Sequence, residues 1–255
     1  MNTPHTNILG VGISAVNMRH ALDTIHTWIA QRVPHYVCIF TVHSVMECQR
    51  NERLRAIANR SGMTTPDGMP LVWLSRLRGH RDVSRVYGPD LMLALCDESI
   101  EKGYRHFFYG GAEGVADELA ARLTERYPGL QVAGTYSPPF RPLTEDEDQQ
   151  VVDLINRSGA DIVWVGLGTP KQDFWVADHV GRLEAPVLLA VGAAFDFHSG
   201  RKRQAPRWMQ RAGLEWLFRL LTEPRRLWYR YLVLNPLFIA LVTLQLLGLR
   251  RYTLD

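Results

Sequence analysis

Residues 162–172, IVWVGLGTPKQ, decide the fold of this 255-residue chain. Four apolar residues run directly into a turn with two glycines, Thr169 and Pro170, and the polar pair Lys171 and Gln172 begins the next predicted helix. A short apolar run that leads through glycines into a helix is typical of a parallel α/β sheet. Ligands bind at the carboxyl ends of such strands, so we expect Gly168, Lys171 and Gln172 to face a substrate.

On both sides of this stretch, predicted strands and helices alternate over the first 198 residues. Thr144 and Glu147 have the spacing of a capping box at the start of one helix. Strands are predicted at 7–11, 36–40, 106–109, 130–135, 161–165 and 186–191, and helices at 17–31, 45–59, 71–77, 89–102, 115–127 and 146–156. This alternation predicts a Rossmann-like α/β domain, residues 1–198, with a mostly parallel sheet and helices on both faces.

The chain after residue 198 differs in charge and in hydropathy. It holds 11 Lys and Arg against 3 acidic residues, a charge of +8, whereas residues 1–198 carry −5. Residues 224–232, PRRLWYRYL, interleave arginines with aromatic side chains and precede the apolar run 236–249. That run falls short of the roughly 20 residues that a transmembrane helix needs. We therefore expect residues 199–255 to form a helical appendage in the membrane interface; docking on the domain or on a second subunit is the alternative.

Composition excludes several functional classes. Cys38, Cys48 and Cys96 are odd in number and lack C-x-x-C spacing, so we expect neither a disulfide framework nor a zinc site. The N-terminus has no basic region followed by a long apolar run, which favours a cytoplasmic location. P-loop, zincin and α/β-hydrolase motifs do not occur in the sequence, and we expect no nucleic-acid partner.

Two glycine-rich turns each allow two interpretations. Residues 10–15, GVGISA, match the dinucleotide fingerprint, but Thr41 follows the second predicted strand where a ribose-binding acid is required. We interpret them as a turn in the first strand–helix unit; a nucleotide-dependent oxidoreductase is the alternative. Residues 109–115 place Gly110 and Gly111 between a strand and a helix, where free N–H groups would suit a diphosphate and a tight turn is the alternative.

Three charged residues stand at positions that suit a reaction site. Asp67 lies in T-P-D-G-M-P, where two prolines restrict the backbone and could position a catalytic carboxylate, although an Asx-turn is the usual role. Arg85 precedes a helix and is either a surface charge or a phosphate ligand. Asp196 follows the last predicted strand as either a ligand contact or a helix cap.

The segments TPDGMPLVW, RVYGPDLM, FYGGAEGVA, VGLGTPKQDFW and the tail from GAAFDFHSG to PRRLWYRY resemble the WecG/TagA/CpsF family of bacterial glycosyltransferases. The resemblance covers nearly the whole chain. It implies a metal-independent, inverting enzyme without a cofactor that transfers a sugar from a UDP-sugar to a saccharide on polyprenyl diphosphate. It also implies peripheral attachment to the cytoplasmic face of the inner membrane. His43 stands where several members have Asn, a variant that is similar to the exopolysaccharide branch.

The resemblance also implies roles for individual residues. Asp67 corresponds to the proposed general base, and Thr41 and Gln172 line the substrate pocket, with His43 beside them. An inverting transfer independently requires one base at the acceptor hydroxyl and positive charge or N–H groups at the departing UDP. Candidates for the second task are Arg85 and the turns at Gly110 and Gly168. The arginines expected to bind the lipid diphosphate are Arg207, Arg211, Arg219, Arg225, Arg226 and Arg230.

Several alternatives remain open from the sequence. A non-catalytic membrane adaptor would make Asp67 and Gln172 incidental. The donor sugar could be glucose, glucuronate, N-acetylmannosamine or its uronate. The apolar tail could be covered by lipid or by a second copy of the chain, so a homo-oligomer is not excluded.

Overall fold

The computed structural model describes residues 3–254, apart from the side chain of Arg211. Within these residues, a central sheet has six strands in the order β4-β3-β8-β7-β5-β6, and all neighbouring strands are parallel. The strands are β3 (His35–Phe40), β4 (Met63–Pro66), β5 (Arg105–Gly110), β6 (Gln131–Tyr136), β7 (Ile162–Gly166) and β8 (Val187–Ala190). The predicted α/β fold with a parallel sheet is therefore confirmed.

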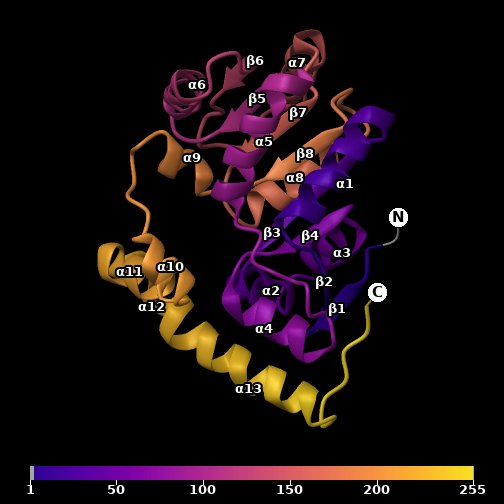
Figure 1. Ribbon diagram of the computed structural model, residues 1–255, viewed down its shortest axis with the longest axis vertical. Helices are drawn as coiled ribbons and strands as arrows, with labels where there is room; N and C mark the ends of the chain where they lie inside the picture. Colours follow the sequence, from indigo (N-terminus) through magenta and orange to yellow (C-terminus); the bar gives the residue numbers. More distant parts are fainter. Residues whose placement is uncertain (1–2, 255) are drawn as a thin grey trace.

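Helices cover both faces of this sheet (Figure 1). In β7, Ile162 and Trp164 point into one apolar cluster while Val163 and Val165 point into the other, so the whole strand is apolar. The first cluster contains α1 (Met18–Gln31), α5 (Gly88–Lys102), α6 (Val115–Arg126) and α9 (Ala194–His198). The second contains α2 (Val42–Cys48), α3 (Glu52–Arg60), α4 (Met69–Leu77), α7 (Glu145–Ser158) and α8 (Lys171–His179).

The N-terminal glycine motif forms a hairpin and not a strand–helix unit. β1 (His5–Ile8) and β2 (Val11–Ser14) pair in antiparallel register as a separate two-stranded sheet. Leu9 and Gly10 at the corner have φ values of 54° and 82°, as a tight hairpin turn requires. The predicted first strand of the main sheet was therefore wrong. A dinucleotide site needs a helix directly after the glycine turn, so the hairpin also removes the basis for an oxidoreductase.

Two further predictions fail between residues 42 and 66. The single helix predicted over 45–59 is divided into α2 and α3, because the Asn51 side chain accepts a hydrogen bond from Leu54 N (3.0 Å) and caps a new helix. No strand was predicted directly before Asp67, yet the edge strand β4 lies there and ends at Pro66. Proline is tolerated there because an edge strand leaves one side unpaired.

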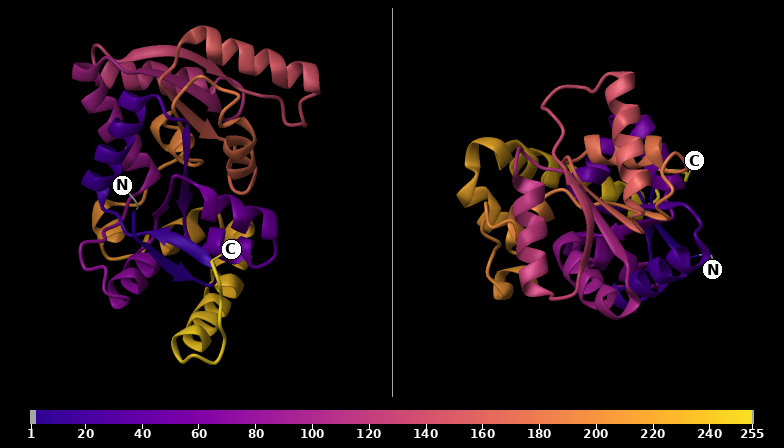
Figure 2. Two further views of the ribbon diagram at one scale, coloured as in Figure 1. Left: turned by 90° about the vertical axis from the view of Figure 1, so that its right-hand side faces the viewer. Right: turned by 90° about the horizontal axis from the view of Figure 1, so that it is seen from above.

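The C-terminal segment runs along the outside of the domain and returns to the hairpin (Figures 1 and 2). Its elements are α10 (Arg207–Arg211), α11 (Glu215–Thr222), α12 (Pro224–Tyr229), a π-helical turn η1 (Arg230–Leu234) and α13 (Asn235–Leu246). Near its end, Tyr252 O accepts a hydrogen bond of 2.7 Å from Asn7 Nδ2. The Gln245 amide also bonds to the backbone of residues 7 and 9.

α12, η1 and α13 form one continuous helix, Pro224–Leu246, of 23 residues. The expectation of a helix too short to span a membrane was wrong, because it counted only the apolar run and not the arginine-rich segment before it. By length and composition alone this helix could cross a membrane. One face nevertheless packs on the domain through Leu227, Leu234, Phe238 and Val242, while much of the rest is exposed. An interfacial location stays a prediction.

The carboxyl ends of β5 and β7 approach closely at a pair of glycines. Gly110 is in register with Gly166 and has a φ of 127°, which side-chain-bearing residues rarely adopt. A Cβ atom on Gly110 would lie 2.7 Å from the carbonyl carbon and oxygen of Gly166. Because both obstacles are backbone atoms, the two strands can keep this spacing only without a side chain at residue 110.

We expect Gly110→Ala to lower the free energy of unfolding by about 3 kcal/mol or more, because strain in φ adds to the backbone clash. Urea unfolding followed by circular dichroism measures this loss. Gly181→Ala is the matched control: its φ is +85° and nothing lies within 4 Å of its Cβ position. It should cost only about 1–2 kcal/mol. Equal losses in the two variants would show that the close strand approach contributes nothing.

Candidate active site

Two cavities meet at the carboxyl ends of the strands. The smaller has a volume of about 230 Å³ and lies between the start of α4 and the C-terminal segment. The larger, about 1350 Å³, extends along the turns that follow β3, β5, β7 and β8. Residues that line both cavities are Thr41, His43, Asp67, Arg219 and Arg230. These five side chains therefore stand at the junction of the two cavities.

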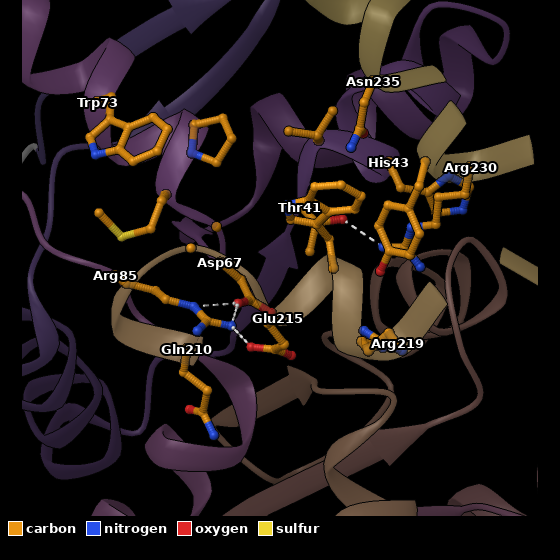
Figure 3. Close-up of a pocket in the computed structure, with 17 residues that line it drawn as sticks. Thr41, His43, Asp67, Trp73, Arg85, Gln210, Glu215, Arg219, Arg230 and Asn235 are labelled. Atoms are coloured by element: carbon orange, nitrogen blue, oxygen red, sulfur yellow. Dashed lines mark hydrogen bonds and ion pairs between the residues drawn. The ribbon is translucent and has the colours of Figure 1, made fainter. Parts of the chain in front are cut away.

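Asp67 is fixed at this junction by the sheet and by an arginine. Its N–H donates to Phe40 O (2.8 Å), which continues the pairing of β4 with β3. Its carboxylate atom Oδ1 accepts hydrogen bonds from Arg85 Nε (3.2 Å) and Nη2 (3.0 Å). The same Nη2 lies 2.7 Å from Glu215 Oε2 (Figure 3). Tyr87 OH donates to Glu215 Oε1 (3.1 Å). Segments far apart in sequence thus meet around one carboxylate.

Burial raises the pKa of Asp67 to about 7, and the negative charge of Glu215 acts in the same direction, while Arg85 opposes both. The side chain is only 12% exposed, so water compensates little for the charge. A carboxyl group with this pKa changes between its protonated and ionised forms near neutral pH. Such a group is suited to accept a proton during a reaction.

Thr41 and His43 lie at the start of α2, opposite two arginines of the C-terminal segment. Thr41 Oγ1 accepts a hydrogen bond from Arg230 Nη2 (2.9 Å). Burial, together with the charges of Arg230 and Arg219, lowers the pKa of His43 to about 3, so its ring is neutral at pH 7. Burial also lowers the pKa of Arg230 to about 10, which leaves it cationic at pH 7.

Arg219 and Arg230 form no ion pair with any carboxylate in the part of the chain that the structure describes. The Arg219 Nε atom is buried and also has no hydrogen-bond partner there. Two such guanidinium groups make the junction of the cavities electropositive. A phosphate or diphosphate group would supply the missing negative charge.

Two glycine N–H groups that the sequence predicted to be free are bound inside the protein. Gly111 N–H donates to Gly166 O (2.9 Å), and Gly168 N–H donates to Gln172 Oε1 (3.0 Å). Gln172 is buried and its Nε2 donates to Ala190 O (3.0 Å). The expectation that these N–H groups bind an anion was wrong for Gly111 and Gly168, because protein acceptors occupy them. The Gln172 amide thus connects the turn at Gly168 to the end of β8.

Other predicted residues lie farther along the larger cavity. Lys171 is exposed on its wall, and Asp196 on the same wall is held by Lys202 Nζ at 2.9 Å. Arg226 also lines this cavity and pairs with Glu223 at 2.7 Å.

The six arginines expected to bind diphosphate are therefore divided. Arg219, Arg226 and Arg230 reach a cavity, whereas Arg207 and Arg225 are exposed and line neither one. The side chain of Arg211 lies outside the described residues. The predicted role of Arg207 and Arg225 in the site is not supported by their placement.

Several residues of the smaller cavity were missed from the sequence. Glu215 is one of 3 acidic residues in the basic segment, and that isolation was the available signal. Trp73, Trp216 and Tyr231 give this cavity aromatic walls. They come from α4, α11 and η1, and no local pattern connects them.

No group of three or more His, Cys, Asp or Glu side chains in the described part of the chain is arranged to hold a metal ion. Cys38, Cys48 and Cys96 are buried free thiols.

Comparisons with known proteins identify the family of the chain. The model of the glycosyl transferase WecG/TagA/CpsF family matches residues 6–252. A Bacillus spizizenii protein named N-acetylglucosaminyldiphosphoundecaprenol N-acetyl-beta-D-mannosaminyltransferase is 33% identical over 216 residues, which cover 85% of this chain and 81% of the relative. A Bacillus subtilis protein of the same name is 32% identical over 176 residues, covering 69% and 66%. This chain therefore belongs to the WecG/TagA/CpsF family of glycosyl transferases.

Proposed function

We propose that this enzyme transfers a sugar from a UDP-sugar to a saccharide carried on polyprenyl diphosphate, with inversion at the anomeric carbon and without a metal ion. The observation that carries the proposal is the position of Asp67 where the two cavities join. An inverting transfer needs one base between acceptor hydroxyl and donor sugar, so two cavities on either side of one carboxylate match it. The names of both relatives describe transfer to N-acetylglucosaminyl-diphosphoundecaprenol.

The larger cavity is assigned to the donor. Its size suits a nucleotide sugar, and Arg219, Arg226 and Arg230 supply positive charge for the diphosphate. The smaller cavity is assigned to the acceptor saccharide. Trp73, Trp216 and Tyr231 offer flat apolar surfaces on which the C–H face of a sugar ring can pack.

In the proposed reaction, the Asp67 carboxylate removes the proton from the acceptor hydroxyl. The oxygen then attacks the anomeric carbon from the side opposite the UDP, and the bond from that carbon to the diphosphate oxygen breaks. The electron pair leaves with UDP. Its additional negative charge is stabilised by Arg219 and Arg230, which the protein does not neutralise by ion pairs among the described residues.

We assign residues 199–255 to a membrane-binding appendage at the cytoplasmic face of the inner membrane. The helix Pro224–Leu246 exposes Trp228, Leu232 and Ile239, and Arg250 and Arg251 follow it. Aromatic and apolar side chains beside arginines suit the headgroup region of an anionic membrane. This location would bring the smaller cavity near a lipid-linked acceptor. His43 remains the reason to favour an exopolysaccharide pathway.

We expect Asp67→Asn to reduce kcat at least about 100-fold, because the amide cannot accept the proton. The assay incubates a panel of UDP-sugars with a short-chain prenyl diphosphate monosaccharide. Product should form in EDTA, and NMR should find the anomeric configuration opposite to that of the donor. Asp153→Asn, an exposed carboxylate of α7, is the matched control and should keep full activity. Near-normal turnover of Asp67→Asn would contradict the role of Asp67 as the base, whereas no transfer by the unaltered protein with any donor would favour the adaptor interpretation.

We expect kcat/KM to rise with pH up to a plateau above about pH 7. The pKa of Asp67 is raised to about 7, so the ionised form that can accept a proton is depleted as the pH falls. The loss should approach tenfold per pH unit well below the pKa. Initial rates between pH 5 and 9 measure it. A flat profile between pH 5 and 7 would contradict Asp67 as the base in this environment.

We expect Trp73→Ala to raise the KM for the acceptor about tenfold and to leave the KM for the donor unchanged, since Trp73 lines only the smaller cavity. The indole is 56% exposed, so the fold should tolerate its loss. Trp208→Ala is the control, because Trp208 is 64% exposed and lines neither cavity. A raised KM for the donor would reverse the assignment of the two cavities.

A further inference from the structure

One carboxylate of the C-terminal segment reaches the arginine that holds Asp67. Glu215, at the start of α11, has a side chain that is 13% exposed, and its Oε2 atom lies 2.7 Å from Arg85 Nη2. Its other oxygen accepts a hydrogen bond from Tyr87 OH at 3.1 Å. Both oxygens of Glu215 are thus bound to one short segment of the α/β domain, and Figure 3 shows the contact with Arg85.

Arg85 contacts only one of the two carboxylate oxygens of Asp67. Arg85 Nε and Nη2 both donate to Oδ1 of Asp67, and the Tyr87 ring lies 4.0 Å from the guanidinium carbon. An unrestrained arginine usually grips both oxygens of a carboxylate side by side. Here Nη2 is shared with Glu215, and none of the described residues donates a hydrogen bond to Asp67 Oδ2. Asp67 Oδ2 is also not among the fully buried polar atoms that lack a partner, so this atom keeps some exposed surface.

We propose that Glu215 is a positioning residue for the transfer reaction: it holds Arg85 on Asp67 Oδ1 alone and so leaves Oδ2 open to the acceptor hydroxyl. This inference rests on the proposed function, in which Asp67 is the base. It makes the base dependent on the C-terminal segment, because the carboxylate that orients Arg85 comes from that segment.

Glu215 also affects the pKa of Asp67, because its negative charge lies close to that carboxyl group. The facing groups are His43 from α2, Arg85 and Tyr87 from the segment that enters α5, Glu215 and Arg219 from α11, and Arg230 from η1. Glu215 raises the pKa of Asp67, whereas Arg85 and Arg219 lower it. Loss of the Glu215 charge should therefore lower the pKa of Asp67. The same change frees Arg85 to bind both oxygens of Asp67, which should lower that pKa further.

The test is the pH dependence of kcat/KM for Glu215→Gln in the full chain. The acid limb should move down by about one pH unit and the plateau should fall about tenfold, since the base is weaker and less accessible. Glu215→Asp retains the charge and should keep the acid limb near that of the unaltered enzyme. Glu118→Gln is the matched control, because Glu118 forms the separate ion pair with Arg201 of the C-terminal segment. It should leave both midpoint and plateau unchanged.

Loss of rate in Glu215→Gln with an unchanged midpoint would overturn the inference and leave Glu215 as a docking contact only. A profile that matches the unaltered enzyme would overturn it as well. If Glu215→Gln does not fold, Glu215→Ala decides, because it removes the same charge and leaves no side chain to hold Arg85; its acid limb should move down, and no shift refutes the inference. Full activity of Asp67→Asn would instead overturn the role of Asp67 as the base, on which this inference rests.

Discussion

The site depends on the interaction between the buried carboxylate of Asp67 and the guanidinium group of Arg85. Removing an ionised carboxylate from water costs several kcal/mol, and one arginine offsets this cost only in part. Burial therefore prevails and raises the pKa of Asp67 to about 7, although Arg85 lies 3.0 Å away. The sheet makes this placement possible, because the pairing of β4 with β3 continues through the Asp67 N–H. The raised pKa of this carboxyl group is thus a property of the fold as much as of the residue.

The sheet could be predicted because its strands carry their own signal. A strand buried on both faces must be apolar throughout, as residues 162–165 are, and the capping box at Thr144 forms as its spacing predicts. The hairpin was missed because a left-handed glycine serves a strand–helix turn and a hairpin turn equally well. β4 was missed because its four residues include two threonines and a proline, which resemble a turn. In both cases pairing with distant residues decided the outcome.

One part of the site was predictable because its residues stand at strand ends, and another because the arginines of the C-terminal segment are clustered in the sequence. Asp67 and Thr41 stand at such ends and line the junction of the cavities. The N–H groups of Gly111 and Gly168 failed as anion donors because their acceptors lie in other elements or on another turn of the chain. Glu215 acts on Arg85 across 130 residues, a distance at which no local sequence pattern operates.

The return of the chain end to the β1–β2 hairpin limits how the C-terminal segment can move. Gln245 and Tyr252 bind the hairpin near Asn7, so the segment is attached to the α/β domain at both of its ends. If the acceptor carries a long isoprenoid chain, as proposed above, this anchoring would require that chain to reach the smaller cavity from the side of the segment. Any opening of the smaller cavity must then arise from bending between the two anchors, with the ends held in place.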